Sequence, residues 1–291
     1  MANYNIKDVY SVFNKIDGYF YEKKLDGGGT VEYTDASIRK YCPNKNSSGY
    51  GTCSDYLQRA RSGVINLLEN LEKYNLEYDK LAEYAILFLS YKLKQHSQHK
   101  STNLNTFYTK HIEKNVDYNK KIKGNGSPTY KEVIDKKKDL MNMNIKERSK
   151  FNDPFSILVL LYNEIKKNNK DCTNLSKKAN EFVQNFKELN EDSNINGNTS
   201  YIKLLSTLSN DYDNFKIYFA EKCNGCNDLP TLPEIKTPPS KLIPALSVVS
   251  VIPVFLGIAY KYSLFGVDKL FQRQYIRKKL KKVKNKLKIN I

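Results

Sequence analysis

The sequence predicts an all-α fold, in which a multi-helix bundle is followed by a proline-rich stalk and one C-terminal transmembrane helix. Three observations support this prediction. Apolar residues recur at helical spacing over most of the first 222 residues, prolines concentrate between residues 229 and 239, and residues 242–260 contain no charged side chain. The sequence shows no alternation of strand and helix patterns, so it does not predict an α/β fold.

Helical periodicity predicts six long helices within a bundle of six to eight. Two of them cover residues 56–74 and 78–94, and segment 85–90 of the second is apolar nearly all round, which is typical of the most buried helix of a bundle. The apolar positions of the other four helices are Val9, Phe13, Ile16 and Phe20; Phe151, Phe155, Leu158, Tyr162 and Ile165; Leu175, Ala179, Phe182, Phe186 and Leu189; and Tyr201, Leu205, Leu208, Tyr212, Phe215 and Phe219.

Local signals at the helix ends agree with this periodicity. Asp153 followed by Pro154 predicts a helix N-cap with proline at the first helical position, and one of residues 198–200 can cap the helix that begins at Tyr201. Two helical subdomains divided near Gly124 are the alternative to a single bundle. Helix-breaking segments lie at residues 27–29, 44–51, 124–128 and 194–197.

The uncharged segment predicts a single membrane span. At about 1.5 Å per residue it is about 28 Å long, close to the thickness of a hydrocarbon core. The alternative is a buried helix of a soluble domain, which Pro244 and Pro253 favour because each removes an amide donor. The predicted parts are a helical ectodomain at 1–226, a Pro-rich linker at 227–241, a transmembrane helix at 242–264 and a basic cytoplasmic tail at 265–291.

The formal net charge of +17 is concentrated at the C-terminus. From Lys261 onward the chain has eleven Lys or Arg residues and one acidic residue, Asp268, so the positive-inside rule places the tail in the cytosol and the N-terminal domain across the membrane. We also expect the tail to bind anionic lipid, although it could serve only to orient the span. The cations concerned are Arg273, Arg277, Lys278, Lys279, Lys281, Lys282, Lys284 and Lys286.

This charge distribution argues against nucleic-acid binding, because the first 260 residues are only mildly basic. Interleaved Tyr and Lys residues could stack on bases, but most of these tyrosines lie on apolar helix stripes. Residues 1–20 contain neither the apolar run nor the cleavage site of a conventional signal peptide. Either the span itself directs translocation, or export uses another route.

The five cysteines, Cys42, Cys53, Cys172, Cys223 and Cys226, all precede the predicted span, which is the distribution expected for disulfides in an oxidising compartment. Cys42 and Cys53 bracket a short loop and favour a local pair, but the sequence fixes no connectivity. As a redox motif, CNGC would have to open a helix after a strand. As half of a zinc site it would need a second knuckle, which HSQH at 96–99 does not supply.

The sequence does not predict an enzyme. The histidines His96, His99 and His111 do not accompany a recognisable Ser or Cys nucleophile motif, and the glycines at 27–29 lack the downstream residues of a phosphate-binding loop. We therefore assign no catalytic, cofactor-binding or metal-binding residue, and expect no cofactor.

Several segments resemble a known family. The chain is similar to the Plasmodium interspersed repeat (PIR) proteins, most closely the rodent-malaria branch of CIR, BIR and YIR type, from about Tyr10 to the C-terminus. The segments are YCP at 41–43, AILFLSYKLKQ at 85–95, FYTKHIEKN at 107–115, DLMNMNIKERSKF at 139–151, LLSTLSNDYDNFK at 204–216 and GIAYKYSLFG with the basic tail at 257–288.

The resemblance implies a multigene variant antigen of a malaria parasite, with a helical ectodomain, one C-terminal membrane helix and no catalytic residues. It also implies export to the infected red cell, antigenic variation, and immune evasion or binding to host cells. Family members often carry a cysteine at the position of Val159. The loss of one half of a pair would explain the odd cysteine count and would leave Cys172 or another thiol without its family partner.

Two functions of different class follow. The first is a membrane-anchored surface antigen or adhesin with an unidentified host partner, whose exposed loops form the working surface because they can vary while the core is kept. The second is an interaction or remodelling protein inside the exporting cell, whose basic tail binds lipid or a cytoskeletal partner. The loops expected to form the surface are residues 26–53, 95–106, 120–130 and 190–199.

Overall fold

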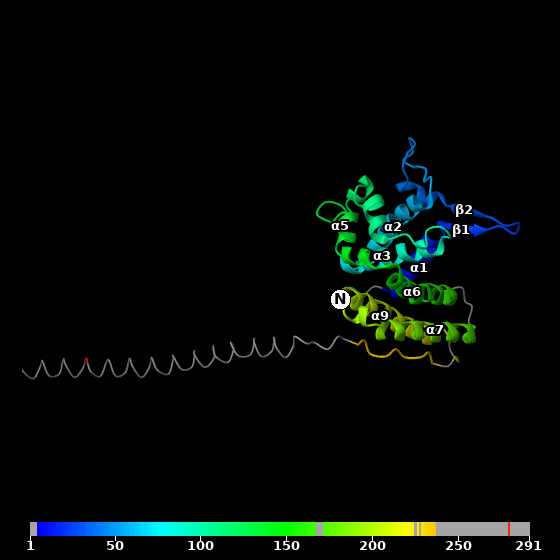
Figure 1. The fold of residues 1–291 in the computed structure, drawn as a ribbon, viewed down its shortest axis with the longest axis vertical. Helices are drawn as coiled ribbons and strands as arrows, with labels where there is room; N and C mark the ends of the chain where they lie inside the picture. Colours follow the sequence, from blue (N-terminus) through cyan, green and yellow to red (C-terminus); the bar gives the residue numbers. More distant parts are fainter. Residues whose placement is uncertain (1–4, 167–170, 224–225, 227, 237–278, 280–291) are drawn as a thin grey trace, which may run out of the picture. The chain divides into compact units, whose positions relative to one another are not determined.

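The computed structural model describes residues 5–166, 171–223, 226, 228–236 and 279 (Figure 1). The chain divides into two compact units, Met1–Lys236 and Thr237–Ile291, so the alternative of two subdomains divided near Gly124 is wrong. The elements of the first unit are α1 (Ile6–Asp17), β1 (Phe20–Lys24), β2 (Thr30–Thr34), η1 (Ala36–Tyr41), α2 (Tyr56–Glu72), α3 (Tyr78–Gln95), α4 (Leu104–Phe107), η2 (Tyr108–Ile112), η3 (Val116–Asn119), α5 (Tyr130–Asp135), η4 (Lys138–Asn142), α6 (Ile145–Lys166), α7 (Cys172–Glu191), α8 (Ser193–Asn196) and α9 (Thr199–Lys222).

The six long helices predicted from periodicity are present as α1, α2, α3, α6, α7 and α9. Helix α6 packs against α1 and α3 on one side and against α7 and α9 on the other (Figure 1). Helices α2 and α5 cover the outer side of α3. The all-α prediction is thus confirmed for the bundle, except for the two-stranded hairpin β1–β2.

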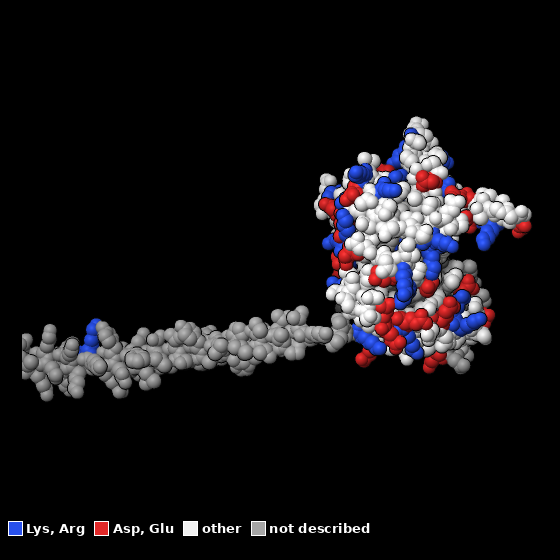
Figure 2. Space-filling view, in the orientation of Figure 1, with Lys and Arg blue, Asp and Glu red and all other residues white. Residues whose placement is uncertain are grey.

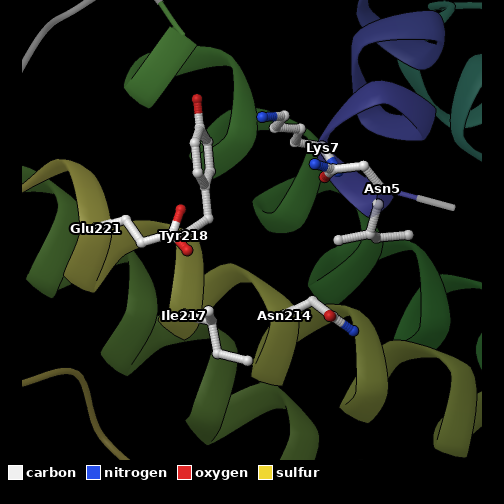
Figure 3. Close-up of a pocket in the computed structure, with 7 residues that line it drawn as sticks. Asn5, Lys7, Asn214, Ile217, Tyr218 and Glu221 are labelled. Atoms are coloured by element: carbon white, nitrogen blue, oxygen red, sulfur yellow. The ribbon is translucent and has the colours of Figure 1, made fainter. Parts of the chain in front are cut away.

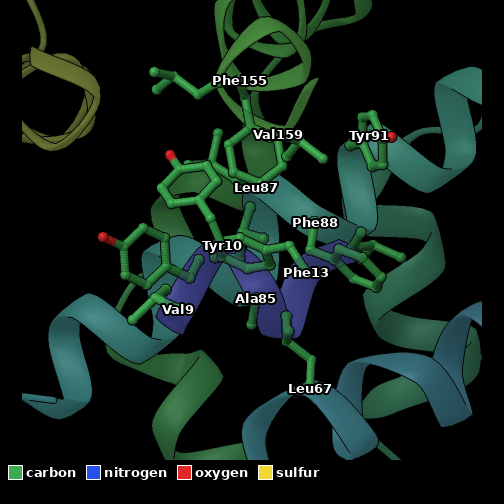
Figure 4. Close-up of a cluster of buried hydrophobic side chains, with 14 of the residues drawn as sticks. Val9, Tyr10, Phe13, Leu67, Ala85, Leu87, Phe88, Tyr91, Phe155 and Val159 are labelled. Atoms are coloured by element: carbon green, nitrogen blue, oxygen red, sulfur yellow. The ribbon is translucent and has the colours of Figure 1, made fainter. Parts of the chain in front are cut away.

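Helix α3 is the centre of the core, as the apolar run at residues 85–90 predicts. Every residue from 81 to 93 is buried, so the helix has no solvent-facing side over this length. The α1 side chain of Phe13 contacts it edge-on, with ring centroids 5.3 Å from Tyr84 and 5.3 Å from Phe155 of α6 (Figure 4). Aromatic contacts therefore join α1, α3 and α6 at one point.

Two boundary predictions are wrong. Phe20 continues the apolar spacing of α1, but α1 ends at Asp17 and Phe20 begins strand β1. Pro154 does not open a helix, because α6 begins at Ile145 and Pro154 lies inside it. The true start carries a reciprocal cap, in which Glu147 N–H donates to Asn144 Oδ1 over 2.9 Å and Asn144 N–H donates to Glu147 Oε2 over 3.1 Å.

The cap of α9 is confirmed within the predicted range. Asn198 Oδ1 accepts hydrogen bonds from the N–H groups of Ser200 and Tyr201, at 2.9 and 3.2 Å. The side chain thereby satisfies donors that the first helical turn leaves open.

Candidate functional site

The β1–β2 hairpin projects from the bundle and is the first candidate site (Figure 1). Its base is anchored by Phe20, which is fully buried against α2. Gly63 makes room there, since a Cβ atom at this position would lie 2.6 Å from Cε1 of Phe20. Lys92 of α3 is also fully buried, and its Nζ donates to Phe20 O over 2.7 Å and to Asp17 Oδ1 over 2.6 Å.

The hairpin face toward the bundle is held by charged side chains. Glu22 accepts hydrogen bonds from the backbone N–H and the hydroxyl of Ser97, which lower the pKa of its carboxyl group. Glu32 contacts His96 Nε2 at 3.0 Å and pairs with Arg59. Burial lowers the pKa of His96, which favours the neutral ring. Even-numbered strand residues thus face the bundle.

The opposite face of the hairpin is apolar and exposed. The alternation of a strand places its odd-numbered residues there. Tyr21, Leu25, Val31 and Tyr33 retain 38, 47, 50 and 43% of their surface. The rings of Tyr21 and Tyr33 stack across the strands with centroids 4.9 Å apart. The hairpin stands out as a mostly uncharged projection (Figure 2). A solvated hairpin face is normally polar, so this apolar face indicates an interaction surface.

The loop closed by Cys42 and Cys53 is the second candidate site. The two cysteines form a disulfide with Cα atoms 4.9 Å apart, the local pair that the sequence favours. Both are buried, whereas the loop between them is largely exposed and carries the half-exposed Tyr50. Its backbone is ordered by a bond from Asn46 N–H to Tyr50 O and one from Thr52 N–H to Pro43 O. A disulfide that fixes both ends lets such a loop change its sequence without changing where it leaves the bundle.

Each of the four predicted loops also contains buried residues or buried anchors. Residues 26–53 contain the hairpin and the disulfide-closed loop, but in segment 190–199 Asn190 and Ile195 are buried. Segment 95–106 is held by Arg148 of α6. This fully buried side chain donates hydrogen bonds to the backbone carbonyl groups of Lys100 and Thr102. In segment 120–130 only Ile122 and Tyr130 are buried, so all four predicted loops carry exposed residues.

A second disulfide joins Cys172 at the start of α7 to Cys226. This pair places Cys226 of the CNGC segment in a disulfide. The remaining cysteine of the motif, Cys223, is buried at the end of α9. Val159, which stands where family members often have a cysteine, is buried in α6. The sequence leaves open which thiol lacks its family partner, and the structure places Cys172 in a disulfide.

Residues 228–236, predicted as part of a stalk, pack on the bundle and form what we call the strap. Leu229 is buried, and Pro230 O accepts a hydrogen bond from the hydroxyl of Tyr212 at 2.9 Å. The side-chain amide of Asn190 binds the strap backbone through two hydrogen bonds of 2.8 Å. Its Nδ2 donates to Glu234 O, and its Oδ1 accepts from Lys236 N–H. The rest of the predicted linker, residues 237–241, lies outside the described residues.

A groove of about 350 Å³ lies between the start of α1 and the end of α9 (Figure 3). Lys7 extends toward the ring of Tyr218, with Nζ 5.6 Å from the ring centroid. Ile217 and Glu221 of α9 complete the lining near them. The groove combines one cation, one anion and amides on an open surface, an arrangement that does not select a particular ligand.

Asp211 is a buried acid that sequence reasoning does not find. Its carboxylate accepts hydrogen bonds from the hydroxyls of Tyr10 in α1 and Tyr84 in α3, at 2.8 and 3.0 Å. Its backbone carbonyl accepts from the hydroxyl of Tyr162 in α6, at 2.9 Å. Burial raises the pKa of Asp211 to about 6, although Lys80 and the two hydroxyls lower it in part. Four helices therefore meet at one titratable group.

The change Asp211→Asn tests this titration. Because the folded-state pKa is raised, protonation of Asp211 stabilises the fold fully below the unfolded pKa near 3.8, and this contribution is lost as pH rises through about 6. Asparagine does not titrate. The stability of the variant relative to the wild type should therefore rise by about 2 kcal/mol between pH 4 and pH 7. Urea unfolding across this range measures the difference, and a pH-independent difference would contradict the assignment.

The predicted span and nearly all of the tail lie outside the described residues. Lys279 is described as an exposed helical residue, whereas Arg273, Arg277, Lys278, Lys281, Lys282, Lys284 and Lys286 are not described. In the part of the chain that the structure describes, no helix combines the length and hydropathy needed to cross a membrane.

The arrangement defines a class of protein: a disulfide-bonded helical domain that presents a hairpin and a closed loop on its surface. Comparison with solved structures agrees with this class. The fold is similar to that of a solved Plasmodium PIR protein ectodomain. The TM-score is 0.57 and the sequence identity is 33%, and the match covers 80% of this chain and 99% of that chain. No curated protein matches the chain.

The sequence model of the Plasmodium variant antigen proteins Cir/Yir/Bir matches residues 10–261. The chain therefore belongs to this family of Plasmodium variant antigens, and the resemblance seen in the sequence is confirmed.

Proposed function

We propose that the chain is a single-pass membrane-anchored variant surface antigen that is exported to the infected red cell. The ectodomain lies outside and the tail lies in the cytosol. The protein acts in antigenic variation, immune evasion or host-cell adhesion, without catalysis and without a cofactor. The observation that carries the proposal is that the match to the variant antigen family extends to residue 261, across the whole uncharged segment 242–260.

The ectodomain presents its disulfide-closed loop away from the strap. In Figure 1 the strap runs along the face of the bundle opposite to the loop closed by Cys42 and Cys53. The first compact unit ends at Lys236, the last residue of the strap. The disulfide-closed loop therefore lies on the opposite side of the ectodomain from the residue at which the strap ends.

The second candidate is an intracellular membrane-associated protein that remodels the host cell. The observation that favours it is the density of cations after residue 272, each of which adds about 1 kcal/mol of attraction near an anionic leaflet. The two candidates differ in which side of the membrane carries the ectodomain.

Protease treatment of intact infected cells distinguishes the two functions. With one epitope tag at each end of the chain, the surface antigen should lose its N-terminal tag to external trypsin and keep the C-terminal tag inside. The intracellular protein should keep both tags. Permeabilised cells provide the control, because both tags must then become accessible in either case.

Charged substitutions in the uncharged segment test the anchor itself. Val251→Asp combined with Phe255→Asp should move the full-length chain from the membrane pellet to the supernatant of an alkaline carbonate wash, since each acid costs about 3 kcal/mol near the bilayer centre. Val251→Leu with Phe255→Leu is the matched control and should stay in the pellet. Extraction of the wild-type chain by carbonate would sink the single-span proposal.

A further inference from the structure

We infer that the free edge of strand β2 is a docking site for an extended segment of a partner protein, which adds to the hairpin as a third strand. The segment has apolar side chains at alternate positions and at least one acidic side chain. The proposed function requires a surface that binds a partner, and the inference states the chemistry of that partner. It therefore rests on the proposed function.

The hydrogen bonds of the hairpin show which backbone groups are available. Asp35 N–H donates to Tyr19 O over 2.7 Å, and Leu25 N–H donates to Gly29 O over 3.1 Å, both in the register of the strands. In an antiparallel ladder, hydrogen-bonded pairs alternate with non-hydrogen-bonded pairs. Both observed bonds join odd-numbered residues, so the odd-numbered positions bond across the hairpin. The N–H and C=O groups of the even-numbered residues therefore point to the two outer edges.

The two edges differ. On the β1 edge, Phe20 O is already taken by the ammonium of Lys92, and two lysines at 23 and 24 give the strand the charge that proteins use to block edges. On the β2 edge, the backbone groups of Thr30 and Glu32 make no hydrogen bond within the described residues. The strand TVEYT has strong β propensity and contains neither Lys nor Pro. The β2 edge is thus the one prepared for strand addition.

The outward face supplies side-chain contacts for the added strand. Val31 and Tyr33 lie on β2 itself, and Tyr21 and Leu25 extend the patch over β1. Together they form an apolar area on the order of 300 Å². A stable interface between two rigid domains buries about 800 Å² on each side, so this patch alone is too small for one. A strand that also forms main-chain hydrogen bonds gains affinity without a larger patch.

The charges of this face select the partner. Glu22 and Glu32 point toward the bundle, where they contact Ser97, His96 and Arg59, which leaves Lys23 as the charged strand residue of the outward face. An acidic side chain on the added strand lies within reach of Lys23 across β2, because strands are about 4.8 Å apart. A second copy of this chain that paired through its own β2 would present Val31 and Tyr33 on this face and no acid to Lys23. A lipid surface is disfavoured by Asp26, which follows Leu25 at the end of the hairpin.

A phage-displayed library of random ten-residue peptides, panned on the full-length chain immobilised through its C-terminus, tests the inference. The enriched peptides should alternate apolar residues and contain Asp or Glu. A synthetic copy of the most enriched peptide should slow amide exchange at Glu32 and Thr30 at least tenfold, whereas exchange at Val31 should change little. Slowed exchange at these outward amides is specific to strand pairing.

Three variants refine the test. Thr30→Pro removes one outward N–H and leaves the hairpin bonds intact, so peptide binding should weaken at least tenfold. Val31→Glu should weaken it similarly by placing an acid on the patch. Val116→Glu is the matched control, because Val116 is 76% exposed on another part of the surface, and binding should not change. Each variant must keep the unfolding midpoint of the wild type.

Three results would overturn the inference. One is that no peptide family is enriched, and another is that bound peptides leave the amides of Glu32 and Thr30 unprotected. The third is that Val31→Glu abolishes self-association of the chain, or binding to vesicles of phosphatidylcholine and phosphatidylserine, but not peptide binding. The binding assay uses no cells, so an absence of peptide binding would not contradict the proposed surface location. Conversely, an intracellular location of the protein would not abolish peptide binding.

Discussion

Replacing Phe13 with Ala should lower the free energy of unfolding by about 3–5 kcal/mol. Phe13 is fully buried and its ring contacts four other aromatic rings, with the centroids of Tyr10, Tyr84, Phe155 and Phe88 at 5.2, 5.3, 5.3 and 6.1 Å (Figure 4). Truncation leaves a cavity where α1, α3 and α6 meet, and three helices cannot all relax into it.

Chemical denaturation followed by far-UV circular dichroism measures this loss, since the chain has no tryptophan to report unfolding. Leu160→Ala is the matched control. Leu160 lies on α6 but is 40% exposed, so its truncation should cost less than about 1 kcal/mol. Equal losses for the two variants would mean that the aromatic cluster is not the centre of the core.

Replacing Lys92 with Ala should cost about 3 kcal/mol, because it removes a fully buried ammonium and leaves the half-buried Asp17 and the buried carbonyl of Phe20 without their partner. The ammonium of Lys92 holds Asp17 at the end of α1 and the carbonyl of Phe20 at the start of β1. It also lies 4.4 Å from the centroid of the Phe20 ring. Without it, the hairpin base loses its hydrogen bond and its packing together, so amide exchange in β1 should also accelerate.

Lys94→Ala provides the comparison for Lys92. Lys94 is two residues further along α3 and pairs with Asp153, and the two side chains are 38 and 50% exposed. Such surface pairs contribute about 0–1 kcal/mol, so this variant should unfold almost like the wild type. If both alanine variants lost the same stability, the loss would come from helix propensity rather than from the buried contacts of Lys92.

The sequence predicts the long helices well. Burial of one helix face requires apolar residues at helical spacing, and this periodicity remains visible when single positions depart from it. It also identifies α3 as the central helix, since a helix without a polar face must be enclosed. The hairpin was missed for a physical reason: Phe20 has the right spacing for α1, but Gly18 ends that helix and the next strands are too short to show a pattern. The start of α6 was missed because the capping box at Asn144 and Glu147 is a weaker signal than Asp-Pro.

The surface was harder to predict than the core. Cys42 and Cys53 could be proposed as a pair because they are close in sequence, whereas Cys172 and Cys226 come together only through the packing of α7 and α9. Buried charges such as Lys92 and Arg148 are also determined by tertiary contacts. The one available signal for Lys92 was its position just after the apolar run at residues 85–90, where a buried charge must find a partner.

The strap gives the molecule a defined response to tension. If a bilayer holds the chain beyond Lys236, a pulling force first breaks the two hydrogen bonds to Asn190. The strap then detaches toward Cys226, which releases on the order of 30 Å of extended chain. At Cys226 the covalent link to Cys172 transfers the force to the first turn of α7. The ectodomain can therefore lengthen by a short, fixed distance under force while its helices remain folded.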